Sequence, residues 1–228
     1  MILLAADTSG KNGSLALARI HDAQGRPQSA TFEILDLVPL EGGTFSAQLV
    51  PQISGLLTKR GLKKQDISGF AVVSGPGSFT GLRVGLAAIK ALAEILYKPI
   101  AAVSRLEAVA RSGLVHGRVV SAIDAGRGEV YVGEYELGSR AMLLKQRLVG
   151  TEEFFEEYRG QTIVVFDPAL ADAAHTHAMR VEQVPEPHAD VIARLGCEKI
   201  QSGETIPADE LEANYIRRSD AEIFAKHS

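Results

Sequence analysis

The sequence predicts an α/β fold of two duplicated lobes, each with a mixed sheet flanked by helices. Residues 2–17 (ILLAADTSGKNGSLAL) and 119–132 (VVSAIDAGRGEVYV) repeat one pattern about half a chain apart. In each repeat, an apolar strand ends in an aspartate, and a glycine-rich turn leads into a second strand. This order is typical of a hairpin with a carboxylate at its tip. We therefore expect one such hairpin in each lobe, with the lobes spanning residues 1–104 and 105–228.

Strands and helices alternate along the first lobe. Residues 31–38 alternate partly between apolar and polar side chains and predict a third strand. Residues 45–57 have apolar side chains three and four positions apart, which predicts a helix even though Pro51 lies within it. Residues 67–74 (ISGFAVVS) predict a short buried strand, and a glycine-rich loop then leads into a second helix over 78–97.

The helix over 78–97 has apolar side chains on nearly every side. Such a helix must be covered on more than one side. It is therefore either a buried central helix or one whose outer side meets another protein, with the helix over 45–57 as its neighbour. Arg83 is expected to pair with a carboxylate of this chain or of a partner. The residues predicted for a partner interface are Phe45, Leu49, Ile53, Leu57, Leu82, Arg83, Gly85, Leu86, Ile89 and Leu92.

The loop at 74–81 (SGPGSFTG) has two interpretations. Its glycines and the helix that follows suit a phosphate cradle, although the spacing matches neither a Walker loop nor a dinucleotide fingerprint. The alternative is a tight turn capped by Ser78 or Thr80. The two hairpin aspartates would either hold Mg·ATP across a cleft between the lobes or serve as structural turn residues. The candidate nucleotide contacts are Asp7, Thr8, Ser9, Gly75, Gly77, Ser78, Thr80 and Asp124.

The second lobe gives weaker signals. After the hairpin at 119–132, residues 143–149 predict a strand, and Thr151 followed by two glutamates predicts a helix start. Residues 163–167 (IVVFD) predict a buried strand, with helices over 168–179 and 188–202. A last helix over 220–226 would cover either lobe.

Composition limits the function classes. The chain has 228 residues, 46% of them hydrophobic, and a net charge of −4, so no overall basic character points to nucleic-acid binding. Any contact with tRNA would then need a partner's charge. The single Cys197 excludes an internal disulfide, which fits a reducing compartment, and the apolar start is cut short by Asp7. We therefore expect a cytoplasmic protein without a membrane segment.

Three motifs together resemble one protein family. SGPGSFTGLRVG at 74–85, ADTSGKNGSLALA at 6–18 and AIDAGRGEVYVGEYEL at 122–137 closely resemble the TsaB (YeaZ) family, which acts in bacterial tRNA threonylcarbamoyladenosine biosynthesis. The segment NYIRR at 214–218 resembles the closing element of that family. For the region from about 137 to 212, the resemblance implies fold only. The implied fold is the duplicated actin-like, ribonuclease-H-like (ASKHA) fold.

The resemblance implies a partner more than a catalyst. In this family a TsaD-like paralogue transfers a threonylcarbamoyl group from its adenylate to the adenosine beside the anticodon of tRNAs that read ANN codons. The TsaB-like chain is its noncatalytic, activating subunit and pairs with it through helices equivalent to 45–57 and 78–97. A TsaE-like ATPase joins the pair, tRNA is reached through the complex, and homodimers use the same face. No cofactor is intrinsic to the chain, and ATP or ADP with Mg²⁺ would bind at the heterodimer interface.

The resemblance also implies where a metal would be bound. TsaD-like enzymes hold a metal with a His-x-x-x-His pair on the first helix, two ligands one turn apart. Phe45 and Leu49 stand at the matching positions of this sequence. We therefore expect no metal and no catalytic residue in this chain.

Two other function classes remain as alternatives. A small-molecule phosphotransferase of the acetate- and sugar-kinase superfamily would need a substrate-facing base and a complete adenosine pocket, and the sequence indicates neither. A peptidase acting on the TsaD-like partner would need a nucleophile, a base and an orienting group, and no such arrangement is evident. Turnover of ATP by the isolated chain would support the phosphotransferase.

Overall fold

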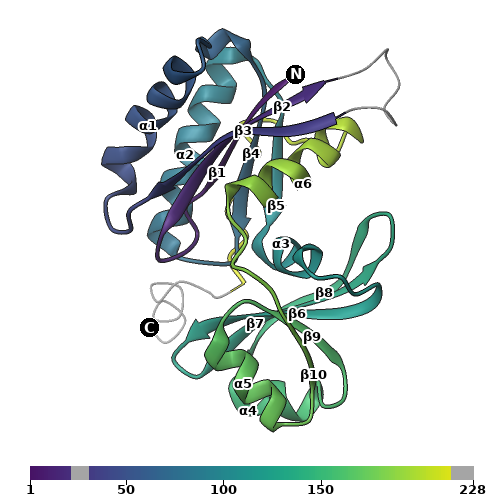
Figure 1. Ribbon diagram of the computed structural model, residues 1–228. Helices are drawn as coiled ribbons and strands as arrows, with labels where there is room; N and C mark the ends of the chain where they lie inside the picture. The colour runs from purple at the N-terminus through teal and green to yellow at the C-terminus, as the bar shows by residue number, and fades with distance from the viewer. Residues whose placement is uncertain (22–30, 217–228) are drawn as a thin grey trace. The chain divides into compact units, whose positions relative to one another are not determined.

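The computed structural model describes residues 1–21 and 31–216 of the chain (Figure 1). These residues form two compact units. Among the described residues, the first unit comprises Met1–Arg105 and Pro187–Ala213, and the second comprises Leu106–Glu186 and residues 214–216. This division differs from the single boundary expected after residue 104, because Pro187–Ala213 returns to the first unit. The helix expected over 220–226 lies outside the described residues.

The first unit is built on a five-stranded mixed sheet in the order β3-β2-β1-β4-β5. Strand β1 pairs with β2 in antiparallel and with β4 in parallel orientation. Every residue of the central strand β1 is buried, as its nearly continuous apolar run predicts. The strands are β1 (Ile2–Asp7), β2 (Gly13–His21), β3 (Thr31–Leu40), β4 (Ile67–Gly75) and β5 (Ile100–Ser104).

Helices cover both faces of this sheet (Figure 1). Helices α1 (Phe45–Lys59) and α2 (Phe79–Leu96) lie side by side on one face, and the short 3-10 helix η2 (Lys64–Asp66) follows α1. Helix α6 (Ala189–Gln201) packs against β1, β2, β4 and β5 from the opposite face. The helices expected over 45–57 and 78–97 are thus confirmed, and Pro51 lies inside α1.

The second unit repeats this plan. Its sheet has the order β10-β9-β6-β7-β8, with β6 antiparallel to β7 and parallel to β9. Its helices are α3 (Arg105–Ser112), α4 (Thr151–Glu157) and α5 (Pro168–Thr176). Its strands are β6 (Gly117–Gly126), β7 (Glu129–Leu137), β8 (Ala141–Gly150), β9 (Thr162–Val165) and β10 (Arg180–Gln183). The predicted duplication is confirmed, because three antiparallel strands followed by two parallel ones occur in the same chain order in both sheets.

The helices that follow the fifth strand of each sheet are exchanged between the units. Helix α3 follows β5 of the first sheet, yet its Leu106 and Val109 belong to the core of the second unit. Helix α6 follows β10 of the second sheet, yet it packs on the first sheet. Sequence proximity therefore assigns α6 to the wrong lobe, whereas the boundary expected after residue 104 already places α3 with the second lobe.

Two close contacts fix α6 on the first sheet. A Cβ at Gly196 would lie 2.3 Å from Cβ of Ala71 on β4, so this side of the helix approaches the sheet closely. At the start of the helix, the buried hydroxyl of Ser14 accepts a 2.8 Å hydrogen bond from the backbone N–H of Ala189. Ser14 on β2 thus satisfies one of the open N–H groups at the start of α6.

Three elements were not predicted, and one cap differs. Strands β5 and β10 and helix α3 are five, four and eight residues long, too short for a clear apolar period. Thr151 begins α4, but the cap position is Gly150 and no side chain caps the helix. None of the helices in residues 1–21 and 31–216 is long and apolar enough to span a lipid bilayer.

Candidate functional site

The first acidic turn follows β1. The Oδ1 atom of Asp7 accepts hydrogen bonds from the backbone N–H of Ser9 (2.8 Å) and from its hydroxyl (2.6 Å). Asp7, Thr8 and Ser9 are only 5%, 2% and 1% exposed. A carboxylate that binds the N–H two residues ahead is a common turn device. The carboxylate of Asp7 therefore already stabilises its own loop.

The turn is fastened to the glycine-rich loop between β4 and α2. The backbone N–H of Ser78 donates to the carbonyl of Ser9 (2.7 Å), and the Thr8 hydroxyl donates to the carbonyl of Gly81 (2.7 Å). A Cβ at Gly77 would lie 2.4 Å from the carbonyl oxygen of Ser9, and one at Gly81 would lie 2.0 Å from that of Thr8. Both positions need glycine, because two backbone segments touch there.

These contacts bear on the two interpretations of the loop. Ser78 is the cap residue of α2, and its hydroxyl accepts from the N–H of Gly81 at 3.3 Å, as the tight-turn alternative predicts. Gly75 has a φ of 128°, and Thr80 is exposed in the first turn of the helix. The amides of Ser78 and Gly81 are thus bonded within the unit. A phosphate at this loop would have to compete with these bonds.

The second acidic turn lies at the end of β6 in the second unit. Asp124 is exposed, and its Oδ1 accepts from the backbone N–H of Gly126 at 2.8 Å. Gly126, Arg127 and Gly128 all have φ between 60° and 72°, as a tight turn requires. The carboxylate therefore has the same local role as that of Asp7. A Mg·ATP site between the two aspartates stays a prediction.

Most residues predicted for the partner interface are buried inside the first unit. Leu49, Leu82 and Ile89 are 1%, 1% and 0% exposed. Six further predicted residues are also buried: Phe45, Ile53, Leu57, Gly85 and Leu86 fully, and Leu92 in part. A Cβ at Gly85 would lie 2.3 Å from Oγ1 of Thr8, so even its glycine position faces inward. Only Arg83 is exposed. The other nine predicted residues therefore face the interior of their own unit wholly or in part, because the apolar spacing marks the side of each helix that packs on that unit, and the partner interface itself stays a prediction.

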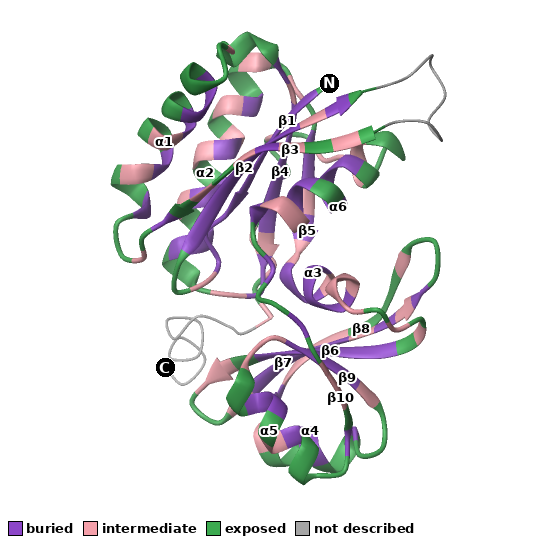
Figure 2. Ribbon diagram, in the orientation of Figure 1, coloured by how far each residue is buried: buried purple, intermediate pink, exposed green. Residues whose placement is uncertain are grey.

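A different set of residues lies on the outside of α1 and α2 (Figure 2). We call these residues the outer face. In α1 they are the exposed Ser46, Ala47, Val50, Pro51, Ser54, Gly55 and Thr58, and in α2 the exposed Ala87, Ala91 and Ile95 with the partly buried Val84, Ala88 and Leu92. None of these residues is charged, although α2 also carries the exposed Arg83 and Glu94 beside them. Val50 and Ile95 are 60% and 66% exposed.

Arg83 borders the outer face at the beginning of α2. Its guanidinium lies 3.7 Å from the centre of the Phe79 ring, and both side chains are exposed. This stacking is a cation–π contact. The contact gives the charge of Arg83 an aromatic neighbour at the surface. The expected pairing of Arg83 with a carboxylate stays a prediction.

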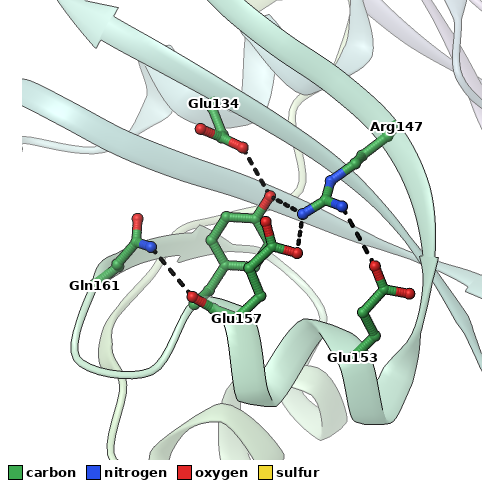
Figure 3. A network of polar contacts seen from close by, with 6 residues as sticks. Glu134, Arg147, Glu153, Glu157 and Gln161 are labelled. Carbon is green, nitrogen blue, oxygen red and sulfur yellow. Dashed lines mark hydrogen bonds and ion pairs between the residues drawn. The ribbon is translucent and has the colours of Figure 1, made fainter.

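A polar network joins α4 to the sheet of the second unit (Figure 3). The hydroxyl of the buried Tyr158 donates to Glu134 (2.8 Å) and accepts from Arg147 (3.0 Å). Arg147 also forms ion pairs with Glu153 (3.3 Å) and Glu157. Burial and the neighbouring Glu134 raise the pKa of Tyr158 to about 12. The hydrogen bond from Arg147 lowers the pKa of Glu157. The two terminal nitrogens of Arg147 and the Tyr158 hydroxyl have partners within the network, whereas the buried Nε of Arg147 has none among the described residues, and these mutual contacts indicate a structural role.

Replacing Tyr158 with phenylalanine should destabilise the protein by about 1–2 kcal/mol, because Glu134 loses its donor while the ring remains in the core. Chemical denaturation followed by circular dichroism would measure the effect. Tyr97→Phe is the matched control, since Tyr97 is 92% exposed and its change should be within about 0.5 kcal/mol. Equal midpoints for the two variants would contradict the structural role of the network.

Comparison with known proteins connects this geometry to a family. A family model described as "TsaD: tRNA N6-adenosine threonylcarbamoyltransferase" matches residues 42–156, half of the chain. The match includes α1, the glycine-rich loop, α2 and the second acidic turn. The chain belongs to the TsaD family.

Individual relatives narrow the likeness within the TsaD family. The TsaB proteins of Bacillus subtilis and Escherichia coli, both described as tRNA threonylcarbamoyladenosine biosynthesis proteins, are each 29% identical over 97% of this chain and 96% of their own length. YeaZ from Pseudomonas aeruginosa has the same fold, with a TM-score of 0.68, 24% identity and coverage of 94% of this chain and 99% of that one. The expected resemblance to TsaB (YeaZ) and the duplicated two-lobe fold are both confirmed.

The metal site implied by the TsaD-like enzymes does not fit the residues of this TsaD-family chain. Phe45 and Leu49, which stand at the two ligand positions, are 7% and 1% exposed and have no donor atom. A Cβ at Gly13 would lie 3.0 Å from the Phe45 ring and 2.6 Å from the carbonyl oxygen of Asp7. The ring therefore packs against the backbone beside the first acidic turn. No group of three or more histidine, cysteine, aspartate or glutamate side chains is placed to hold a metal within the described part of the chain.

Proposed function

We propose that this chain is the noncatalytic accessory subunit that binds and activates a TsaD-like threonylcarbamoyltransferase. The product is N6-threonylcarbamoyladenosine next to the anticodon of tRNAs that read ANN codons. The single observation that carries the proposal is the outer face of α1 and α2. Family membership supplies the reaction, and the outer face supplies the means of pairing.

The outer face has the composition of a protein interface. The exposed side of α1 from Phe45 to Thr58 has no charge, although 23% of the residues in the chain are charged. Exposed apolar residues that occur singly need no explanation, but an uncharged exposed side along α1, together with exposed apolar residues of the neighbouring α2, is typical of a protein-binding site. The cores of protein interfaces are depleted in charged residues in the same way. A paralogue with the same fold would present two equivalent helices, so four helices would pack together.

The side chains at the expected catalytic positions support an accessory role. Phe45 and Leu49 offer no metal ligand, and Asp7 is buried and accepts two hydrogen bonds from Ser9. A carboxylate in this state would need to give up its turn to act as a base or to bind a metal ion. The catalytic groups therefore belong to the TsaD-like partner in this proposal.

We propose that ATP or ADP with Mg²⁺ binds at the junction with the partner rather than to this chain alone. The amides of Ser78 and Gly81 are already bonded within the first unit. The predicted contacts with exposed side chains are Ser78, Thr80 and Asp124. A TsaE-like ATPase joins the assembled pair, and in the absence of the paralogue two copies of this chain pair through the outer face.

The decisive experiment is threonylcarbamoyl transfer to tRNA in a reconstituted reaction. It contains the TsaD-like partner, the TsaE-like ATPase, ATP and the threonylcarbamoyl-adenylate supply, with and without this chain. We expect modified tRNA to form only when the chain is present. Radiolabelled threonine retained on tRNA is the measurement.

Two results, one from this experiment and one from an ATPase assay of the isolated chain, would contradict the proposal. Equal modification without the chain would show that it is not a subunit of the reaction. Steady ATP turnover by the isolated chain would instead favour the small-molecule phosphotransferase. Titration calorimetry with ADP, on the chain alone and on the pair, would separate a nucleotide site in this chain from one at the junction.

A further inference from the structure

Four cations gather in the turn that follows α1. Lys59, Arg60, Lys63 and Lys64 lie within six consecutive positions, 59–64, of a chain whose net charge is −4. We call these four residues the basic turn. All four are exposed. The basic turn is therefore a local positive surface on a protein that is negative overall, which the overall composition conceals.

The first two cations hold the turn in place. Asp36 on β3 accepts from Nζ of Lys59 at 2.7 Å and from Nε of Arg60 at 3.2 Å, and Arg60 also donates to the carbonyl of Leu35. Bonding to Lys59 and Arg60 lowers the pKa of Asp36, so this carboxylate stays ionised well below neutral pH. This pairing ties the end of α1 to the sheet.

The backbone makes the turn rigid as well. The N–H of Leu62 donates to the carbonyl of Leu57 (2.9 Å), and that of Gly61 donates to Thr58 (3.0 Å). Gly61 has a φ of 64°, so α1 ends in a Schellman motif. On the far side, the carboxylate of Asp66 accepts from the backbone N–H of Lys63 at 2.7 Å. These hydrogen bonds thus fix the backbone at Lys63 and Lys64.

Lys63 and Lys64 are not explained by the fold. Among the described residues, no carboxylate forms an ion pair with either ammonium group. Both lysines stand at the beginning of η2, where a positive charge is unfavourable for a helix end. Fixed backbone positions with two ammonium groups directed to solvent suit a ligand with a regular array of negative charges.

We propose that the basic turn binds the sugar-phosphate backbone of the tRNA that the assembled complex modifies. This inference rests on the proposed function, which brings tRNA to the complex. Lysine is a common phosphate-binding residue, and contacts to phosphate position an RNA without reading its sequence. The net charge of the chain is −4, so binding to the basic turn would favour one orientation of the RNA. This surface also revises the expectation that every tRNA contact needs a partner's charge.

The test measures tRNA binding by the complete complex, with and without the change Lys63→Ala/Lys64→Ala. Fluorescence anisotropy of labelled tRNA would be recorded between about 50 and 200 mM salt. We expect the slope of log Kd against log salt to fall by about 2, since each lysine–phosphate contact contributes about 1. The matched control is Arg159→Ala/Arg180→Ala, which removes two exposed cations of the second unit and should leave the slope unchanged.

Each outcome bears on the inference. An unchanged slope and Kd in the Lys63→Ala/Lys64→Ala complex would overturn it. So would weaker assembly of the complex with unchanged tRNA binding, because the basic turn would then contact an acidic protein surface. Failure of the proposed function is recognised separately, since transfer by the unaltered proteins would then proceed without this chain.

Discussion

Gly81→Ala should destabilise the isolated protein by about 2–4 kcal/mol. The added Cβ would lie 2.0 Å from the carbonyl oxygen of Thr8, and the contact is with backbone that cannot rotate away. Relief requires the beginning of α2 to move away from the first acidic turn. That movement would also stretch the hydrogen bonds from Thr8 to Gly81 and from Ser78 to Ser9. The free energy of unfolding, obtained by urea denaturation, measures the loss.

Gly55→Ala is the matched control, because it makes the same change within a helix. A Cβ at Gly55 would meet nothing within 4 Å. Alanine has a higher helix propensity, so this variant should be more stable by about 0.5–1 kcal/mol. The two identical substitutions should therefore differ in sign. If Gly81→Ala is as stable as Gly55→Ala, the close contact between the two loops is not present in solution.

Ile95→Glu should weaken pairing with the TsaD-like partner by roughly a hundredfold. Ile95 is 66% exposed, so glutamate is tolerated in the isolated chain, whereas in the pair its charge would be buried without a counter-ion. Such burial costs about 3 kcal/mol or more, which corresponds to that change in Kd. Light scattering and titration calorimetry would measure pairing, and threonylcarbamoyl transfer at limiting concentrations should fall with it.

Leu114→Glu is the control for this variant. Leu114 is 88% exposed on the loop between α3 and β6 of the second unit, so the same gain of charge should leave pairing unchanged. If Ile95→Glu is folded and pairs as tightly as the unaltered chain, the outer face is not the binding surface. Gly85→Arg would be a poor test, because it would disturb the contact with Thr8 inside the unit.

The sequence predicts most of the fold because its repeats and apolar periods are long. The strand ending in Asp7 and the strand ending in Asp124 share a visible pattern, and both lead into hairpins with the same hydrogen-bonded turn. Short elements escape prediction, since β10 has only four residues and half of them are charged. The placement of α6 escapes for another reason. It depends on a tertiary contact between Gly196 and Ala71, which are 125 positions apart in the sequence.

The apolar spacing of α1 and α2 reflects packing within the unit, for a physical reason. Leu49 and Ile89 repeat at helical spacing because the core of the unit requires it, and the partner contributes nothing to that period. The sequence does contain a usable signal, which is the absence of charge between Phe45 and Thr58 on positions outside the apolar stripe. The acidic turns show the reverse case. The sequence predicts which residues form these turns, but the hydrogen bonds to the carboxylate of Asp7 become visible only in the structure.

The exchange of α3 and α6 has a consequence for synthesis on the ribosome. The N-terminal unit lacks one cover of its sheet until Gln201 has emerged, by which time every described strand and helix of the other unit has already been translated. The unit that is begun first therefore receives its last helix after the strands and helices of the second unit. In the interval, the apolar face that α6 later covers is open to chaperones or to unwanted association, and premature termination before α6 leaves the first unit without a finished core. Duplication has thus produced a polypeptide whose two halves are not separable folding units.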